Sequence, residues 1–266
     1  MSNERPFRVL IITIQEYYYI PLFLRPVLES DGFEVCGVVT MPPTLGSENT
    51  VRFAAGLFRR FGPRVFAKHV RFFGKYALRD CFARYTGRGH AYSASTLARR
   101  HGIPHRHVTD VSSESFRSYV ESLEPMLVAS VAATQRFDGD LLAIPEVGAI
   151  NLHSSLLPEY RGVSPSFWTL LHDESETGVT AHYMNEQIDG GDIVRQQSLP
   201  IEDDDTLHSL NRRVAERGSE VLLDAIGAIR DGMVDPEPMD VDGGSYYSLP
   251  DREDVRDFLR SGNQFY

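Results

Sequence analysis

The first strand-like stretch of the chain reads Phe7-Arg-Val-Leu-Ile-Ile-Thr13, and it is apolar apart from Arg8 and the closing threonine. Such a run is typical of a strand buried on both faces of a parallel sheet. Further strand-like stretches alternate with helix-like ones, the strands at 33–40, 103–108, 126–133 and 149–153 and the helices at 20–30, 95–102 and 112–123. Repeated β-α units predict an α/β fold: a doubly wound, mostly parallel sheet with helices on both faces.

Three later segments depart from this alternation. Residues 44–90 show helical spacing of Phe and Arg, which predicts a helical insertion. Residues 178–200 read as two strands around the turn Asp189-Gly-Gly, and Thr206 is expected to cap a long helix to about Gly232. We expect a main domain at 1–205 with an insertion at about 44–90, and a C-terminal helix and tail at 206–266 packed on the same domain.

Composition and charge restrict the class of protein. The 266 residues suffice for one large domain, with or without a small appendage. A net charge of -10 argues against nucleic-acid binding by the whole surface. Residues 44–90 nevertheless hold ten Arg/Lys against two acidic residues, a balance of +8 that leaves -18 elsewhere. Acidity with only two lysines fits a high-salt cytoplasm, and GC-rich coding explains it equally well.

No feature of the sequence indicates export or a membrane span. No apolar run approaches the ~18 residues that a span needs. Met1 to Arg5 lead into the apolar run Val9–Ile14, which is too short for a signal peptide and lacks its cleavage site. Cys36 and Cys81, the only cysteines, fit neither a disulfide framework nor a metal site. We therefore expect a cytoplasmic protein without a resident metal.

The segment after the first strand excludes two common cofactor classes. It reads Gln15-Glu-Tyr-Tyr-Tyr19, where a dinucleotide-binding sheet would carry G-x-G-x-x-G. A P-loop is missing as well. The predicted sheet is therefore of the doubly wound kind, but the chain should not be a dehydrogenase.

Asn151 and His153 are the first candidates for chemistry. Two residues apart on a strand, they point to the same face, near the carboxyl end where open α/β sheets bind ligands. An amide and an imidazolium pointing the same way form a plausible oxyanion site, and Asp189 could favour the charged ring and relay a proton. Each motif alone is more often structural, Asn-x-His as strand packing and Asp-Gly-Gly as a turn.

Three ordered motifs change this balance, namely Gly148-Ala-Ile-Asn-Leu-His-Ser-Ser-Leu-Leu-Pro-Glu-Tyr-Arg-Gly162, Thr177-Gly-Val-Thr-Ala-His182 and Ile188-Asp-Gly-Gly-Asp-Ile193. With them the region from about Met126 to Gln197 resembles the folate-dependent formyltransferase family, which includes glycinamide ribonucleotide, methionyl-tRNA and sugar-nucleotide formyltransferases. The resemblance extends loosely to the first two strands, and it does not explain residues 44–90.

The resemblance implies a Rossmann-like formyltransferase fold and a catalytic set of Asn151, His153 and Asp189. It implies 10-formyltetrahydrofolate as formyl donor. His153, as imidazolium, and the Asn151 amide would stabilise the oxyanion, while Asp189 would keep His153 charged and assist proton transfer. The pterin slot would lie between the loop after the fourth strand and the loop before the catalytic aspartate, which gives Ala133, Thr134, Gln135, Gln187 and Ile188 as cofactor-binding candidates.

Four further residues are candidates for substrate contact, each with a structural alternative. His182 either points into the site or packs within its strand. Arg161 either meets an anionic acceptor or is solvated in a loop. Tyr17 and Tyr18, with Tyr19 just past the first strand, either stack on a sugar or base or pack as apolar side chains.

The acceptor amine is expected to be an amino sugar, nucleotide- or lipid-linked. A methionyl-tRNA formyltransferase without its usual C-terminal barrel ranks second, because about 34 residues follow the long helix. The remaining alternatives are a formyltetrahydrofolate hydrolase, for whose regulatory domain no room precedes Phe7, and a non-catalytic binding protein. The basic insertion at 44–90 suits an anionic acceptor or membrane surface, or else packs its phenylalanines on the core. A homo-oligomer is compatible with the sequence.

Overall fold

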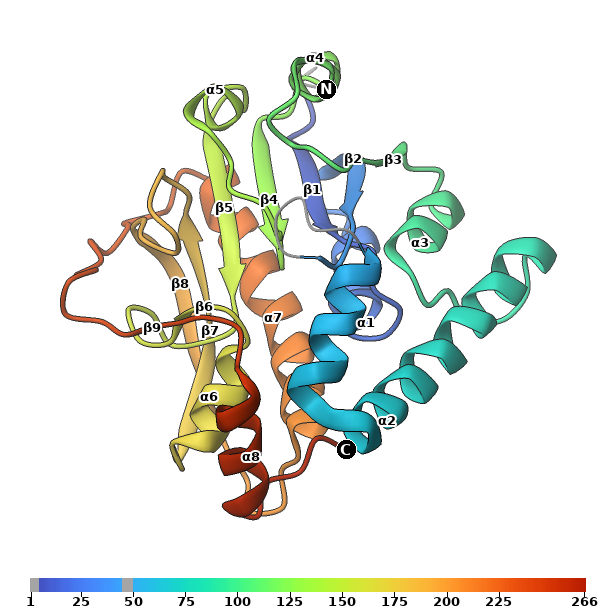
Figure 1. Cartoon of the computed structure of the whole chain (residues 1–266). Coiled ribbons are helices and arrows are strands. Elements are labelled where there is room, and N and C mark those ends of the chain that lie inside the picture. Colours follow the sequence, from blue (N-terminus) through green and yellow to red (C-terminus); the bar gives the residue numbers. More distant parts are fainter. Residues whose placement is uncertain (1–4, 45–49) are drawn as a thin grey trace.

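A mixed sheet forms the centre of the computed structural model, which describes residues 5–44 and 50–266. Within these residues seven strands pair in the order β3-β2-β1-β4-β5-β7-β8 (Figure 1). Their bounds are β1 Arg8–Ile14, β2 Glu34–Met41, β3 His105–His107, β4 Leu127–Val131, β5 Gly148–His153, β7 Glu176–Tyr183 and β8 Ile193–Pro200. Strands β1 to β5 are parallel, whereas β7 and β8 are antiparallel to their neighbours. The predicted fold class is confirmed.

Helices cover both faces of the sheet because side chains of each strand alternate between the faces. Val9 and Ile11 of β1 pack in one core with α1 (Tyr19–Leu28), α3 (Ala94–Arg100), α6 (Pro165–Leu171) and α7 (Leu207–Arg230). Leu10 and Ile12 pack in the other core with α4 (Glu114–Ser122) and α5 (Gly139–Leu142). No helix in the described part of the chain is long and apolar enough to cross a membrane.

The predicted insertion is the helix α2 (Thr50–Thr86); Glu48, counted in its charge, lies outside the described residues. Gly62 breaks this helix with φ of 73°, and Pro63, which has no amide hydrogen, begins the second half. Figure 1 shows the two halves meeting at an angle, with the second running outward from the body of the molecule. The break therefore gives the second half of the insertion a different direction from the first half.

An aromatic cluster attaches α2 to the core, made of Tyr18, Tyr19, Phe72, Phe73, Tyr76, His208 and Tyr266. The Tyr18 ring centroid lies 5.0 Å from Phe72 and 4.8 Å from Tyr76. The buried Asp80 carboxylate accepts hydrogen bonds from Tyr92 N (2.7 Å), Ser93 Oγ (2.7 Å) and Thr96 Oγ1 (2.8 Å). These contacts join the helix to the turns before α1 and α3.

The C-terminal segment packs on the rest of the chain through elements that the sequence did not predict, including a separate two-stranded sheet. Strand β9 (Tyr246–Tyr247) pairs in parallel with β6 (Arg161–Gly162). The helix α8 (Arg252–Arg260) places Phe258 against Phe167 of α6, with ring centroids 4.6 Å apart. The tail then ends against α2, where Tyr266 Oη lies 2.8 Å from His69 Nδ1.

Candidate active site

The candidate site lies at the carboxyl edge of the parallel strands, close to where the strand order reverses between β1 and β4. Asn151 and His153 come from the last residues of β5, and His182 of β7 pairs directly opposite Asn151. Asp189 follows in the loop between β7 and β8. Two strands and one loop thus bring four polar side chains together, three of them the predicted catalytic set.

The Asp189 carboxylate is the centre of this group. Its Oδ2 atom lies 3.6 Å from His153 Nδ1 and accepts a hydrogen bond from Gly162 N at 2.9 Å. Its Oδ1 atom accepts from Asn151 Nδ2 at 3.3 Å and lies 3.7 Å from His182 Nε2. Every polar neighbour named here is a donor or a potential cation, which suits a permanent carboxylate.

The pKa of Asp189 shows the balance of these effects. Burial alone would raise it, but the charge of His153, the nearby His182 ring and the Gly162 N–H lower it to about 2. The carboxylate therefore stays ionised over the whole physiological pH range and keeps a negative charge beside the His153 ring.

His153 differs in one respect from the mechanism expected from the sequence. Its Nε2 atom lies 2.8 Å from Tyr160 O, and its Nδ1 atom faces Asp189. Since a carbonyl oxygen only accepts, Nε2 carries a hydrogen and donates it to Tyr160 O, while Nδ1 faces Asp189 at an ion-pair distance without a hydrogen bond. The Nε2 hydrogen is therefore already engaged, and a protonated His153 would act on an oxyanion mainly through its charge.

His182 points into the site, which was one of the two arrangements expected for it. Its Nε2 atom lies 3.2 Å from Asn151 Nδ2, and its Nδ1 atom lies 2.8 Å from Tyr183 O. A ring that donates from Nδ1 to the carbonyl can accept the Asn151 amide at Nε2. His182 is buried and contacts both Asn151 and Asp189, so we expect it to orient these two side chains and not to touch a substrate.

Glycines allow the backbone to pass close to Asp189. A Cβ atom on Gly162 would lie 2.2 Å from Tyr247 O, and one on Gly191 would lie 2.0 Å from Tyr183 O. Gly162 also has φ of 98°, in the region that favours glycine. Asp189 itself adopts φ of 47°, so the turn that carries the carboxylate is tightly constrained.

The two predicted pterin loops lie against each other. The Arg136 guanidinium, just after the first loop, donates a hydrogen bond to Glu186 O of the second. Gln135 is held in place by Val111 N and Thr109 O, and Thr134 donates to Pro42 O. Ala133 packs on the core beneath, Gln187 N donates to Asn185 Oδ1, and Ile188 is exposed. The first loop is therefore tied both to the second loop and to neighbouring segments of the chain.

The remaining substrate-side candidates fall into two groups. Tyr18 packs within the aromatic cluster, which corresponds to its structural alternative, and Tyr17 is half-buried on the same turn. Arg161 is half-buried next to Gly162, and its side chain makes no hydrogen bond or ion pair with any described residue. Arg161 is thus the cation near the site that remains available to a ligand.

Three contributions to the site were not predicted: the Gly162 N–H, the Tyr160 carbonyl and the tail. Tyr160 N and Arg161 N donate to Ser245 Oγ and Ser245 O, and the Tyr247 ring stacks on Tyr160 at 5.3 Å. The aromatic pair Tyr246-Tyr247 was the one signal in the sequence that could have indicated this role.

Similarity to known proteins identifies the family of this chain. Residues 86–226 match the model of the formyl transferase family. The chain belongs to the formyl transferase family. A similar curated formyl transferase is the methionyl-tRNA formyltransferase of Pelobacter propionicus, 35% identical over 170 residues, which are 63% of this chain and 53% of that protein. The chain spans about half the length of the curated relatives it matches.

Solved formyl transferases share the fold across most of the chain. Glycinamide ribonucleotide transformylase 1 from Symbiobacterium toebii has a TM-score of 0.60 at 18% identity, covering 87% of this chain and 94% of its own. An N-formyltransferase from Helicobacter canadensis, solved with folinic acid and dTDP-3-aminofucose, has a TM-score of 0.58 at 20% identity, covering 92% and 71%. At such identity the likeness concerns the fold.

Proposed function

We propose that this formyl transferase moves a formyl group from 10-formyltetrahydrofolate to an amine, at a site of Asn151, His153 and Asp189. The observation that carries the proposal is the Asp189 carboxylate, with a pKa of about 2, 3.6 Å from His153 Nδ1 and 3.3 Å from Asn151 Nδ2. An imidazole and an amide held beside a carboxylate can stabilise developing negative charge and pass on a proton. Family membership supports the same reaction.

The loops at 132–135 and 185–188 fit the folate donor. They are tied together by the Arg136 hydrogen bond to Glu186 O, and their backbone N–H and C=O groups would hold the pterin. Once bound, the folate supplies the formyl group on its N10 nitrogen. The Helicobacter canadensis neighbour, solved with folinic acid, supports a folate at this fold.

Each residue of the set then has one role. The Asn151 amide would donate a hydrogen bond to the formyl oxygen, in exchange for one of its present hydrogen bonds to His182 or Asp189. His153 would stabilise the negative charge electrostatically, because its ring nitrogens already face Tyr160 O and Asp189. Asp189 would keep His153 charged and assist, through water, the transfer of the amine's proton to the departing N10 nitrogen.

We infer that the acceptor is an amino sugar carried on a phosphate-bearing group, either a nucleotide or a lipid. Arg161 supports this, since an unpaired, half-buried guanidinium suits a phosphate. The position of Glu16 makes a phosphate-binding site directly after β1 unfavourable. Its carboxylate already accepts from Tyr18 N and Ile20 N, both at 2.8 Å, at the α1 N-terminus where a phosphate would otherwise bind.

Methionyl-tRNA is the second acceptor to test. The observation in its favour is sequence similarity, since the curated relatives are named for that activity. A screen of nucleotide-linked amino sugars and methionyl-tRNA, following tetrahydrofolate release, separates the two. Tetrahydrofolate release without any amine would indicate a hydrolase, and no release with any acceptor would indicate a binding protein.

The catalytic set is tested by His153→Ala and Asp189→Asn. Each should lower turnover by about 10²–10³-fold or more while the fold survives. The exposed residues His101 and Asp235 supply the matched controls His101→Ala and Asp235→Asn, which should keep full activity. Near-normal turnover of a folded His153→Ala or Asp189→Asn enzyme would contradict the assignment.

A further inference from the structure

The second half of α2 has two faces of different character. Phe72 and Tyr76 face the aromatic cluster, and Asp80 and Ala83 are buried. The hydrogen bonds of Asp80 to the turn before α3 fix the rotation of the helix. The opposite side of α2 is therefore held outward by packing.

The outward side carries an apolar stripe, defined here as Val70, Leu78, Phe82 and Tyr85. These side chains are 53%, 75%, 62% and 85% exposed. At about 100° per residue, all four lie within one third of the helix circumference. Exposed apolar residues are common singly, but a row of four along one helix is a sign of a binding surface.

A cation row runs beside the apolar stripe. Arg71, Lys75 and Arg79 follow one another at intervals of four residues, and all three are exposed. Residues 50–86 contain one acidic side chain, Asp80, and it is buried on the opposite face. The outer side of α2 thus joins apolar and positive groups without a carboxylate of its own, although the chain as a whole has a net charge of -10.

We propose that the outer face of α2 binds the surface of a lipid bilayer rich in anionic lipids. An interfacial helix lies in the membrane plane and carries Lys and Arg beside Phe and Leu. The second half of α2 carries the same residue types on its outer side. A nucleic acid would pair with the cations and leave the stripe exposed to water. A second copy pairing through α2 would bring two cation rows together.

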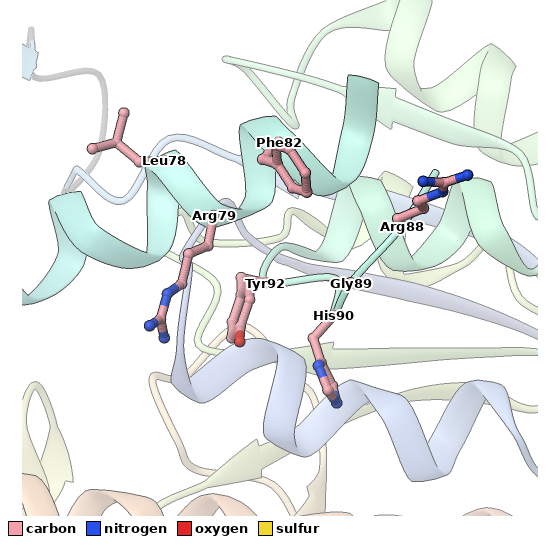
Figure 2. A pocket seen from close by; sticks show the side chains of 7 residues that line it. All are labelled: Leu78, Arg79, Phe82, Arg88, Gly89, His90 and Tyr92. Carbon is pink, nitrogen blue, oxygen red and sulfur yellow. The ribbon is translucent and has the colours of Figure 1, made fainter. Parts of the chain in front are cut away.

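A hollow lies beside the apolar stripe at the outer end of α2, with a volume of about 380 Å³. Leu78, Arg79 and Phe82 of α2 line it together with Arg88 and His90 of the segment that follows. Figure 2 shows the guanidinium groups of Arg79 and Arg88 pointing in different directions. The hollow thus adds positive groups beside the apolar residues of α2 without forming a site for one phosphate.

Vesicle co-sedimentation of the full chain tests the proposal. The protein should bind vesicles of phosphatidylcholine with phosphatidylglycerol at low salt, release at high salt, and ignore pure phosphatidylcholine. The variant Arg71→Gln/Lys75→Gln/Arg79→Gln should bind on the order of 100-fold more weakly, at about fivefold per cation. The matched control, Arg252→Gln/Arg256→Gln/Arg260→Gln on α8, should bind as the unmodified chain does.

Cys81 offers an independent measurement, because it is exposed and neighbours Phe82 on the outer side of α2. Burial raises the pKa of the Cys36 thiol to about 11, so an environment-sensitive maleimide should label Cys81 alone. The label should shift to shorter wavelength on anionic vesicles and be quenched by acyl-chain quenchers. The same label in Cys81→Ser/Arg256→Cys should do neither.

Three outcomes would overturn the proposal. They are no binding to anionic vesicles at low salt, equal binding by the α2 triple variant, and a Cys81 label that stays in water. If the triple variant instead loses affinity for tRNA while no form binds vesicles, the surface serves RNA. None of these outcomes depends on formyl transfer, which the α2 variants should retain.

Discussion

Asp189 gives the candidate site a measurable dependence on pH. Its pKa of about 2 in the folded chain lies below the ordinary 3.8, so the unfolded chain takes up its proton first as pH falls. The stabilisation is therefore complete above about pH 5, is lost as pH falls through about 2, and totals about 2 kcal/mol. Between pH 6 and pH 3, the free energy of unfolding measured with urea should fall by about 1 kcal/mol more in the unmodified chain than in Asp189→Asn. Equal pH slopes of the two proteins would contradict the ionised, paired carboxylate.

Gly162 should be intolerant of any side chain. In Gly162→Ala the new Cβ meets Tyr247 O at 2.2 Å, and φ of 98° strains an alanine. We expect a loss of about 2–4 kcal/mol in unfolding free energy and a fall in activity, because the Asp189 hydrogen bond moves with it. Gly74→Ala is the control: its Cβ meets nothing within 4 Å, and alanine should stabilise α2 by up to about 1 kcal/mol. Urea unfolding of both variants checks this, and an unaffected Gly162→Ala protein would show that β9 is not seated there.

Of the polar groups in the candidate site, the sequence could predict those that belong to side chains but not those that belong to the backbone. Asn151 and His153 were expected on one face because strand side chains alternate, and the structure places them so. Asp189 entered through family resemblance, because nothing in a linear sequence places a residue 38 positions away in contact. The Gly162 N–H and the Tyr160 carbonyl are backbone groups that every non-proline residue has, so their use depends on the fold alone.

The helix α2 should depend on Asp80 for its attachment. Asp80→Ala removes three hydrogen bonds to a buried carboxylate and leaves Ser93 and Thr96 hydroxyls short of an acceptor. We expect a loss of about 2–4 kcal/mol and faster tryptic cleavage within residues 64–86, where several arginines are exposed. Asp240→Ala, at an exposed position of the tail, should change neither. An unchanged cleavage pattern in Asp80→Ala would mean that the aromatic cluster alone holds α2.

Elements with a strong local signal were predicted, and those held by tertiary contacts were not. Thr206 caps α7 through a reciprocal capping box with Ser209, as expected of a threonine before an apolar periodic run. At α4, Ser113 occupies the N-cap position, but its Oγ donates to Asp110 O and caps no helix N–H. Strands β6 and β9 have two residues each and exist because they pair with each other.

Much of the basic insertion packs its phenylalanines on the rest of the chain, which was one of the two expected roles, but the outer face of α2 does not pack in this way. Phe61, Phe72 and Phe73 contact the tail or the aromatic cluster, as a flap packed on the core would. The exposed residues Val70, Leu78 and Tyr85 were not singled out, because the sequence shows helical spacing but not which side of the helix faces the core. The three hydrogen bonds to the buried Asp80 carboxylate fix which side of α2 faces the core.

The order of the strands was beyond prediction because the apolar runs of parallel strands are interchangeable in sequence. The alternation of strands and helices predicted the sheet and its two helical layers. It did not predict that β7 and β8 extend the sheet in the antiparallel sense beside β5. That arrangement brings His182 opposite Asn151, so the site depends on the topology of the whole molecule.

We propose that residues 206–266 unfold as one unit with residues 1–205, because the tail closes the core. Phe258 is fully buried and stacks on Phe167 at 4.6 Å. Phe258→Ala should therefore lower the unfolding free energy by about 3–5 kcal/mol, within a single transition. Fluorescence of Trp168, the one tryptophan of the sequence, reports the core. Leu259→Ala, at the neighbouring 46% exposed position, should stay within about 0.5 kcal/mol of the unmodified protein. A Trp168 transition that keeps its midpoint in Phe258→Ala would show that the tail folds separately from the core.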